Sequence, residues 1–200
     1  MYIQTKLADT EDSSLIIYDT KTKEAQEREI NWQSMFLPTE DGEFFECTLK
    51  NDGLCAEYVN AMLQSTAESK MLTLDSLKNF GFAADTTGNL YSWISTDDTH
   101  LYVYGMTEID PIVAAFNKES GELEAAAALP GMPLFQCIGV DDEYLFYQCS
   151  ELDGGTDSVY WVKKSDFLKM EQHLTAWSRN NAGVFTQADA DGRAKRWNWR

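Results

Sequence analysis

Short apolar runs, each followed by a polar turn, recur along the whole chain. Residues 1–26, MYIQTKLADTEDSSLIIYDTKTKEAQ, align without a gap with residues 145–170, LFYQCSELDGGTDSVYWVKKSDFLKM. Each segment has an apolar and aromatic run, a polar turn, a second apolar run and a polar tail that contains lysine. Short runs rich in Val, Ile, Tyr, Phe and Trp between such turns predict strand–turn–strand units.

Two further copies of this unit lie between the ends of the chain. One copy begins at Asp97-Asp98, which matches Asp141-Asp142, and its second strand is predicted at 112–116. A weaker copy covers 71–76. The last apolar residues before the polar turns serve as anchors of the four units: Tyr18, Leu74, Phe116 and Val162. Their spacing of roughly 40 to 55 residues is typical of a four-stranded propeller blade.

This order of elements resembles the bacterial β-propeller repeats of the quinoprotein-like kind. In those repeats an aspartate, an aromatic strand, a loop, an apolar strand and an Asp/Asn-x-x-x-Gly turn recur. The resemblance implies one repeat domain over 1–200, built of four-stranded antiparallel blades, as a β-propeller or a fragment of one. The tails YDTKTKE and FNKESGE are then the tight turns between the third and outermost strands. Neither the tryptophan docking pattern of the quinoprotein repeat nor a Trp-Asp dipeptide is present, so the subfamily stays open.

Three segments carry helix signals beside this β pattern. The stretch 110–129 begins with Asp-Pro and is rich in alanine, which favours a helix start and helix propensity. Ser165 or Asp166 is a candidate cap for a helix that runs to Trp177. The segment 57–70 is a candidate helical insertion, which would explain the long first spacing. The sequence therefore predicts a mostly β fold with minor helix, and a mixed α+β fold is the alternative.

The alignment places Met1 inside the second strand of a blade. We expect the segment 183–200 to supply the missing strand, or the chain to belong to a longer propeller or to pair with a second copy. The basic tail within it, 193–200, is expected to dock as a strand on the acidic body, with a binding patch as the alternative. The residues after Met1 lack a signal peptide pattern, and apolar runs such as 15–18 are too short to span a membrane. The localisation stays undefined.

Charge narrows the classes of partner. The chain has 33 acidic and 16 basic residues, a net charge of −17, while hydrophobic residues make up 44%. Such a field repels nucleic acid and anionic membranes, so we expect neither as a partner. It attracts basic proteins, although solubility alone is a sufficient reason for acidity.

The cysteines form no C-x-x-C pair, and a zinc site is not expected: they are Cys47, Cys55, Cys137 and Cys149. Antiparallel pairing about the turn at 141–142 predicts Cys137 opposite Phe146 and not Cys149. The same argument at the turn 51–53 predicts Cys47 opposite Tyr58 and not Cys55. We therefore expect free thiols, buried as small apolar residues.

No catalytic or cofactor-binding residue can be nominated. The chain has two histidines, His100 and His173, both expected at the surface, and neither a G-x-S-x-G elbow nor a glycine-rich phosphate loop. The acidic pairs at 97–98 and 141–142 occupy equivalent positions, which favours turn chemistry over catalysis. One metal candidate remains: the stretch around Asp189 and Asp191 resembles the start of an EF-hand calcium loop. A glycine turn between two strands is the alternative there.

These patterns predict a non-catalytic binding module that presents a propeller-like surface to a protein or glycan. The alternative is an acidic inhibitor or immunity-type protein that neutralises a basic target through its charge. A third hypothesis is an enzyme that uses a bound metal or cofactor. The first rests on analogy between folds, which does not by itself define a function.

Overall fold

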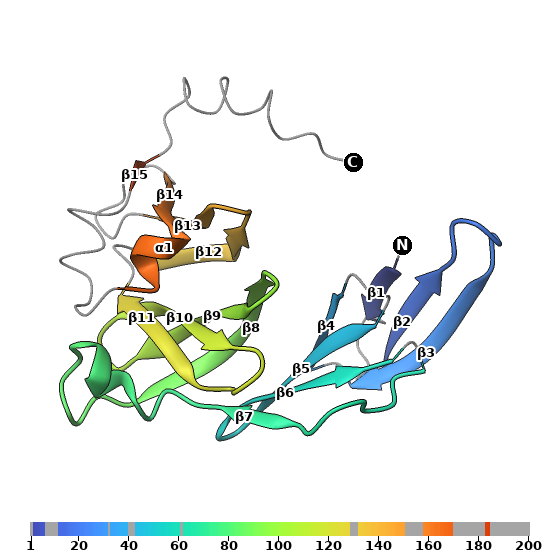
Figure 1. Cartoon of the computed structure of the whole chain (residues 1–200), viewed down its shortest axis with the longest axis horizontal. Helices are drawn as coiled ribbons and strands as arrows, with labels where there is room; N and C mark the ends of the chain where they lie inside the picture. The colour runs from blue at the N-terminus through green and yellow to red at the C-terminus, as the bar shows by residue number, and fades with distance from the viewer. Residues whose placement is uncertain are drawn as a thin grey trace. The chain divides into compact units, whose positions relative to one another are not determined.

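The computed structural model describes residues 2–6, 12–31, 33–39, 43–60, 62–128, 132–150, 158–169 and 183–184. These residues are mostly strand, in several small antiparallel sheets (Figure 1). The chain divides into two compact units, 1–73 and 74–200, where the sequence predicted one domain.

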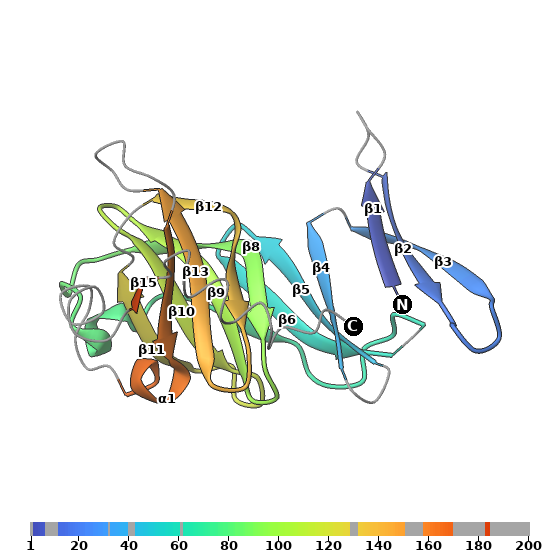
Figure 2. The same ribbon diagram turned by 90° about the horizontal axis from the view of Figure 1, so that it is seen from above.

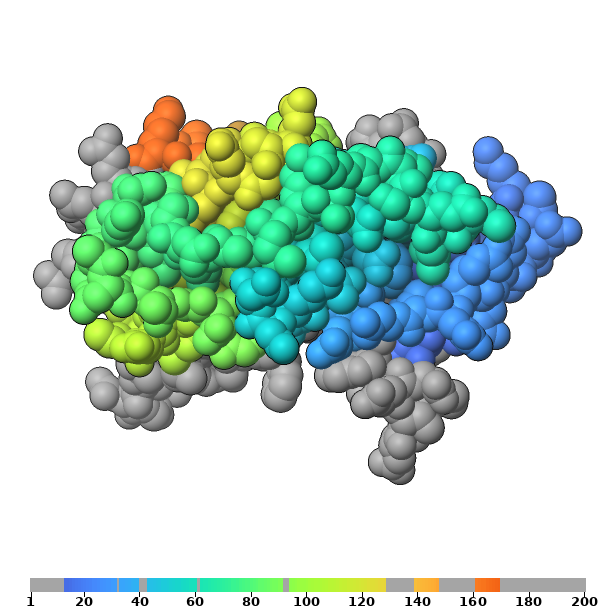
Figure 3. All heavy atoms as spheres, turned by 90° about the horizontal axis from the view of Figure 1, so that it is seen from below, coloured from blue at the N-terminus to red at the C-terminus, as the bar shows by residue number. Residues whose placement is uncertain are grey.

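The first unit contains two sheets in which consecutive strands pair. Sheet A has the order β1-β2-β3 and sheet B the order β4-β5-β6-β7. The strands are β1 (Tyr2–Lys6), β2 (Asp12–Tyr18), β3 (Ala25–Asn31), β4 (Ser34–Pro38), β5 (Phe44–Lys50), β6 (Gly53–Val59) and β7 (Lys70–Leu72). The two sheets pack through a small core of Leu15, Phe36, Phe44 and Val59. Figure 3 shows strands β5 and β6 and the segment that leads into β7 side by side on the surface of this unit.

The second unit repeats this plan. Sheet C contains β8 to β11 and sheet D contains β12 to β15, again with consecutive strands paired. The elements are η1 (Leu77–Phe80), β8 (Gly88–Thr96), β9 (His100–Thr107), β10 (Pro111–Asn117), β11 (Leu123–Ala128), β12 (Met132–Val140), β13 (Tyr144–Ser150), β14 (Ser158–Lys163), α1 (Lys164–Phe167) and β15 (Gly183–Val184). Sheets C and D form two packed layers, with α1 at the end of β14 (Figures 1 and 2). The strand–turn–strand prediction is thus confirmed for the described segments.

The hairpins that align in the sequence also share one pairing register. Tyr2 pairs with Ile17, and the aligned residues Phe146 and Trp161 pair in the same way. The pair Leu101–Phe116 in sheet C corresponds to Leu145–Val162 in sheet D. In sheet B the equivalent pair, whose second residue is also the last apolar residue before a polar turn, is Phe44–Val59, and both residues are buried. Val59 therefore holds the place for which the sequence proposed Leu74, and Leu74 lies beyond β7, outside any strand.

A similar polar turn lies at the end of β2 in sheet A, of β6 in sheet B and of β10 in sheet C. Asp19, Asn60 and Asn117 each accept two backbone N–H bonds from residues two to four positions later. Each turn then contains one residue with positive φ, namely Lys23, Leu63 or Gly121. A short polar side chain favours this geometry because it replaces the backbone partners that the turn leaves unpaired. The predicted turns at 18–24 and 116–122 are confirmed.

The helix signals were mostly overridden. The described part of the stretch 110–129, residues 110–128, contains the hairpin of β10 and β11, in which alanines pack between sheets C and D. Residues 57–59 end β6, and the described residues that follow as far as 69 contain no helix, so the predicted insertion at 57–70 is wrong. A helix does form here, but its N-cap is Lys163 and not Ser165 or Asp166, which lie inside it, and α1 ends at Phe167. Residues 170–177 lie outside the described residues.

The cysteine registers were wrong by two residues, although the thiol prediction holds where it can be checked. Cys47 pairs with Ala56 rather than Tyr58, because Asn51 and Asp52 alone form the turn. In sheet D, Gly139 rather than Cys137 lies opposite Phe146. Cys47 is buried and Cys55 half-buried, and neither is in a disulfide. The side chains of Cys137 and Cys149 lie outside the described set.

Candidate functional site

The acidic pair at 97–98 forms the turn between β8 and β9. The Asp97 Oδ1 atom accepts the backbone N–H groups of Thr99 at 2.9 Å and His100 at 2.8 Å. Asp141 Oδ1 accepts those of Glu143 at 2.8 Å and Tyr144 at 2.6 Å in the equivalent turn of sheet D. The prediction that these pairs serve turn chemistry is confirmed.

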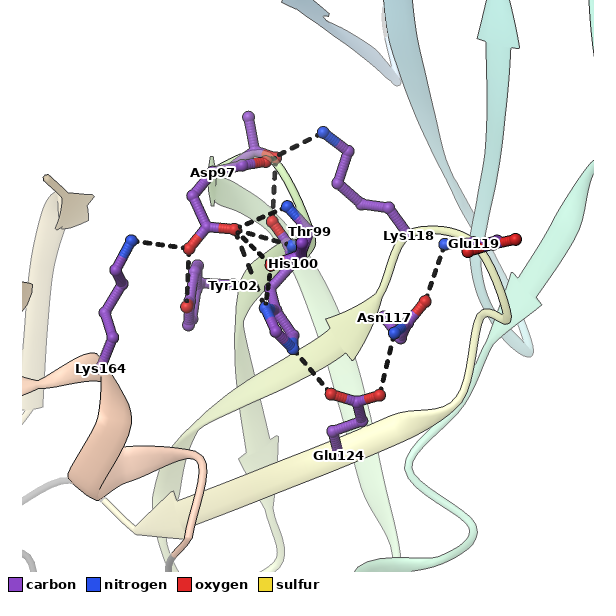
Figure 4. A network of polar contacts seen from close by, with 10 residues as sticks. Asp97, Thr99, His100, Tyr102, Asn117, Lys118, Glu119, Glu124 and Lys164 are labelled. Carbon is purple, nitrogen blue, oxygen red and sulfur yellow. Dashed lines mark hydrogen bonds and ion pairs between the residues drawn. The ribbon is translucent and has the colours of Figure 1, made fainter. Parts of the chain in front are cut away.

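Asp97 also joins the two sheets of the second unit (Figure 4). Its Oδ2 atom accepts the Tyr102 hydroxyl at 3.0 Å and the Lys164 ammonium at 2.9 Å. Tyr102 belongs to sheet C, whereas Lys164 is the first residue of α1 and follows sheet D. The Lys118 ammonium donates to the backbone carbonyl of Asp97 at 2.9 Å. We call the contact between Asp97, Tyr102 and Lys164 the Asp97 clasp.

His100 extends this network towards the outer strand of sheet C. Its Nε2 atom donates to Glu124 Oε2 at 2.7 Å, because a carboxylate can only accept. The Nδ1 atom lies 2.7 Å from the Thr99 hydroxyl. Asn117 Nδ2 donates to the other oxygen of Glu124 at 2.9 Å. The imidazole ring is thereby fixed at both nitrogens, and His100 is buried rather than at the surface as predicted.

The surroundings fix the charges of the network. Burial raises the pKa of the Asp97 carboxyl, but the hydrogen bonds from Lys164, from two backbone N–H groups and from Tyr102 outweigh it and hold that pKa well below its usual value. Burial, reinforced by the Asp97 carboxylate, raises the pKa of Tyr102 far above its usual value. The hydrogen bond from His100 lowers the pKa of Glu124 against the opposing effect of burial. Asp97 and Glu124 are therefore anions at neutral pH, and Tyr102 is a neutral donor.

Two shallow depressions lie beside the clasp. The first, of about 450 Å³, is lined by Glu143, Lys163 and Ser165 together with His100. The second, of about 370 Å³, is bordered by the turn aspartates Asp98, Asp141 and Asp142. Exposed carboxylates thus surround a surface hollow in which an ammonium group and hydroxyl groups are also within reach.

This arrangement does not form a catalytic group. Asp97 accepts five hydrogen bonds through its carboxylate, so its lone pairs are occupied and it cannot act as a general base. His100 is held by Glu124, and its Nδ1 atom lies 2.7 Å from the Thr99 hydroxyl, which itself contacts Asp97, and 3.8 Å from Asp97 Oδ1. Within the described ranges no group of three His, Cys, Asp or Glu side chains is placed to hold a metal ion.

The remaining sequence candidates lie elsewhere. The calcium candidates Asp189 and Asp191, together with His173 and the basic tail 193–200, lie outside the described residues. Sequence reasoning missed Tyr102, Glu124 and Lys164. The only available signal was that Lys164 follows the predicted strand of the sequence repeat that comes directly after the repeat of Asp97.

No protein-family model matches this chain, and the search of curated proteins finds no similar sequence. None of the described helices is both long and apolar enough to cross a membrane.

Proposed function

We propose that this chain is a non-catalytic interaction module whose sheets are blades of the β-propeller type. The sequential pairing of strands within each sheet supports this proposal. So do the shared register of the hairpins and the similar polar turns at the ends of β2, β6 and β10. The resemblance to quinoprotein-like repeats points to the same architecture.

One observation carries the non-catalytic role: the buried polar cluster of the second unit is saturated by its own hydrogen bonds. Active sites place poorly satisfied acids, bases or nucleophiles in a hollow where a substrate completes their contacts. Here the Asp97 carboxylate is completed by Lys164, Tyr102 and backbone groups. The clasp holds two sheets together, and recognition falls to the exposed residues around it.

Those exposed residues favour a protein partner with a basic surface. Asp98, Asp141, Asp142 and Glu143 are exposed at two adjacent turns. Among the described contacts these carboxylates form no ion pair, and turns that present such carboxylates offer good complementarity to lysine and arginine side chains. The net charge of −17 would speed the encounter, which also supports the second candidate function, an acidic inhibitor of a basic target. A glycan partner would use the hydroxyl and ammonium groups of the first depression instead.

A binding measurement with a matched pair of variants tests this function. The probe is a lysine-rich peptide, and binding is followed by biolayer interferometry at low and high salt. The test variant combines Asp98→Asn with Asp142→Asn, and the control combines Glu119→Gln with Glu122→Gln at another exposed turn. Both variants lose two negative charges, so only the position of the charge differs. We expect the test variant to bind about five- to tenfold more weakly, and the control to stay within about twofold of the unchanged chain.

Equal weakening in both variants would contradict a local site and leave only the general field of an acidic protein. Binding in a neutral glycan array that is insensitive to both variants but lost in Ser165→Ala would instead identify the glycan alternative.

A further inference from the structure

The second depression beside the Asp97 clasp has an excess of negative charge. Four aspartates and one lysine line it. The lysine, Lys164, is paired with Asp97 (Figure 4). The other three aspartates, Asp98, Asp141 and Asp142, have no cationic partner among the described contacts. This depression therefore presents three carboxylates whose charge a cationic ligand can neutralise.

The chain itself contains a segment of the opposite charge. The basic tail, residues 193–200, has the sequence RAKRWNWR and carries four of the chain's 16 basic residues without an acidic one. The rest of the chain carries all 33 acidic residues. Most of the tail's charge comes from arginine, whose planar guanidinium group binds a carboxylate through paired N–H donors. The tail thus has the chemistry that the second depression lacks.

The tail is also tethered close to this depression. Strand β15 ends at Val184, which pairs with Tyr160 of β14. Lys164, which lines the depression, lies four residues beyond Tyr160, a distance of roughly 13 Å at about 3.3 Å per residue. Arg193 lies nine residues after Val184, and nine residues span up to about 30 Å. The tail can therefore reach the depression, even though the antiparallel β15 leaves β14 in the opposite direction.

We propose that the basic tail occupies the second depression of its own chain and there competes with a basic partner. The inference rests on the proposed function, because tail and partner use the same carboxylates. Single ion pairs at a surface are weak. A tethered ligand is present at an effective concentration on the order of millimolar, however, so even a weak contact is populated. The tail acts through its charges as a built-in inhibitor, and a partner binds only by displacing it.

The test compares two variants of the whole chain that lose the same charge. The tail variant combines Arg193→Gln, Lys195→Gln and Arg196→Gln. The control combines substitutions of three exposed lysines that form no ion pair among the described contacts, Lys21→Gln, Lys50→Gln and Lys78→Gln. Binding of the lysine-rich peptide is followed by biolayer interferometry. We expect the tail variant to bind about five- to tenfold more tightly, and the control to stay within about twofold of the unchanged chain.

A second measurement detects the tail contact without an external partner. A synthetic peptide of residues 185–200 is titrated into the tail variant and followed by calorimetry. It should bind, and the addition of Asp98→Asn and Asp142→Asn to the tail variant should weaken its binding about fivefold or more. The addition of Glu119→Gln and Glu122→Gln instead should change its binding by less than about twofold, because these residues lie at another turn.

A tail variant that binds the lysine-rich peptide no more tightly than the control does overturns the inference. Weaker binding would make the tail a part of the binding surface. Equal loss of the 185–200 peptide with both pairs of substitutions also overturns it, since the contact would then depend only on total charge. A lysine-rich peptide that binds none of the chains contradicts the proposed function, and the titration with residues 185–200 then decides separately whether the tail uses this depression.

Discussion

The two units share a strand plan but differ in how their sheets are held together. Among the described residues, the cluster that joins sheets A and B has four buried apolar residues, from β2, β4, β5 and β6. The cluster that joins sheets C and D has ten, among them three tyrosines and four residues of β10 and β11 that are small or β-branched. The ion pair between Lys164 and Asp97 and the contact of His100 with Glu124 both belong to the second unit.

The difference shows that strand pattern and sheet coupling have separate origins. Alanines such as Ala115, Ala125 and Ala127 leave room on the face of sheet C that is turned towards sheet D, and the rings of Tyr147 and Phe167 belong to the same core cluster. Interiors pack at crystal-like density, so small residues on one sheet must be matched by large ones opposite. The Asp97 clasp adds a charged link between the same two sheets. We therefore expect the second unit to be the more stable of the two.

The largest effect should come from removing a core leucine in either unit. Leu15 and Leu145 are both fully buried, each in the core of its own unit. Leu15→Ala and Leu145→Ala should each lower the free energy of unfolding by about 2 to 5 kcal/mol, with Leu145 at the upper end because it belongs to the larger cluster of buried residues. Hydrogen exchange read by mass spectrometry should show lost protection only in the unit that carries the change. A loss spread over both units would mean that they unfold as one.

The next effect should come from the Asp97 clasp. Lys164→Met removes the ammonium group and leaves the Asp97 carboxylate, whose side chain is 18% exposed, without its counter-charge. We expect the second unit to lose about 2 to 3 kcal/mol, and the first unit to be unchanged. Lys163→Met is the matched control, because Lys163 is exposed and forms no ion pair among the described contacts. An equal loss in both variants would assign the effect to the helix start and not to the clasp.

The clasp also sets the response to acid. The pKa values of Asp97 and Glu124 are lowered in the folded state, so their stabilisation is present above the unfolded pKa of about 4 and is lost as the pH falls below it. Thermal melts from neutral to acidic pH should therefore show a steeper decline for the unchanged chain than for Asp97→Asn. Parallel curves would contradict the role of Asp97 as a stabilising anion.

The sequence predicted the strands well because their signals are local. Alternation and turn residues identified the hairpins at 1–26 and 145–170, and even their common register. Prediction from the sequence failed where tertiary packing determines the secondary structure of a segment. The alanines at 125–128 have high helix propensity, yet they form β11, since only small side chains leave room between sheets C and D. The anchor at Leu74 was wrong. The equivalent strand, β6, ends at Val59, and the turn that begins at Asn60 lacks the lysine-containing tail by which the other repeats were recognised.

The clasp could not be predicted because its members are far apart in the chain. Asp97 and Lys164 are brought together only when sheet D packs on sheet C, and no local pattern encodes that contact. His100 looked like a surface residue because it begins a strand. Its burial depends on Glu124 in β11, the strand that the helix signal had obscured.

The smallest effect should come from the recurring polar turn, which tests whether equivalent positions are equivalent in energy. Asn60 Oδ1 accepts the backbone N–H groups of Met62 at 2.8 Å and Gln64 at 3.1 Å. Asn60→Ala should cost the first unit about 1 kcal/mol, and Asn60→Asp, which retains the acceptor, much less. Asn117→Ala removes the same kind of turn from the second unit and also the bond to Glu124, so it should cost somewhat more. Chemical denaturation with exchange read separately for each unit measures both. Equal losses would mean that the turn itself contributes all of the stability and that Glu124 gains nothing from Asn117.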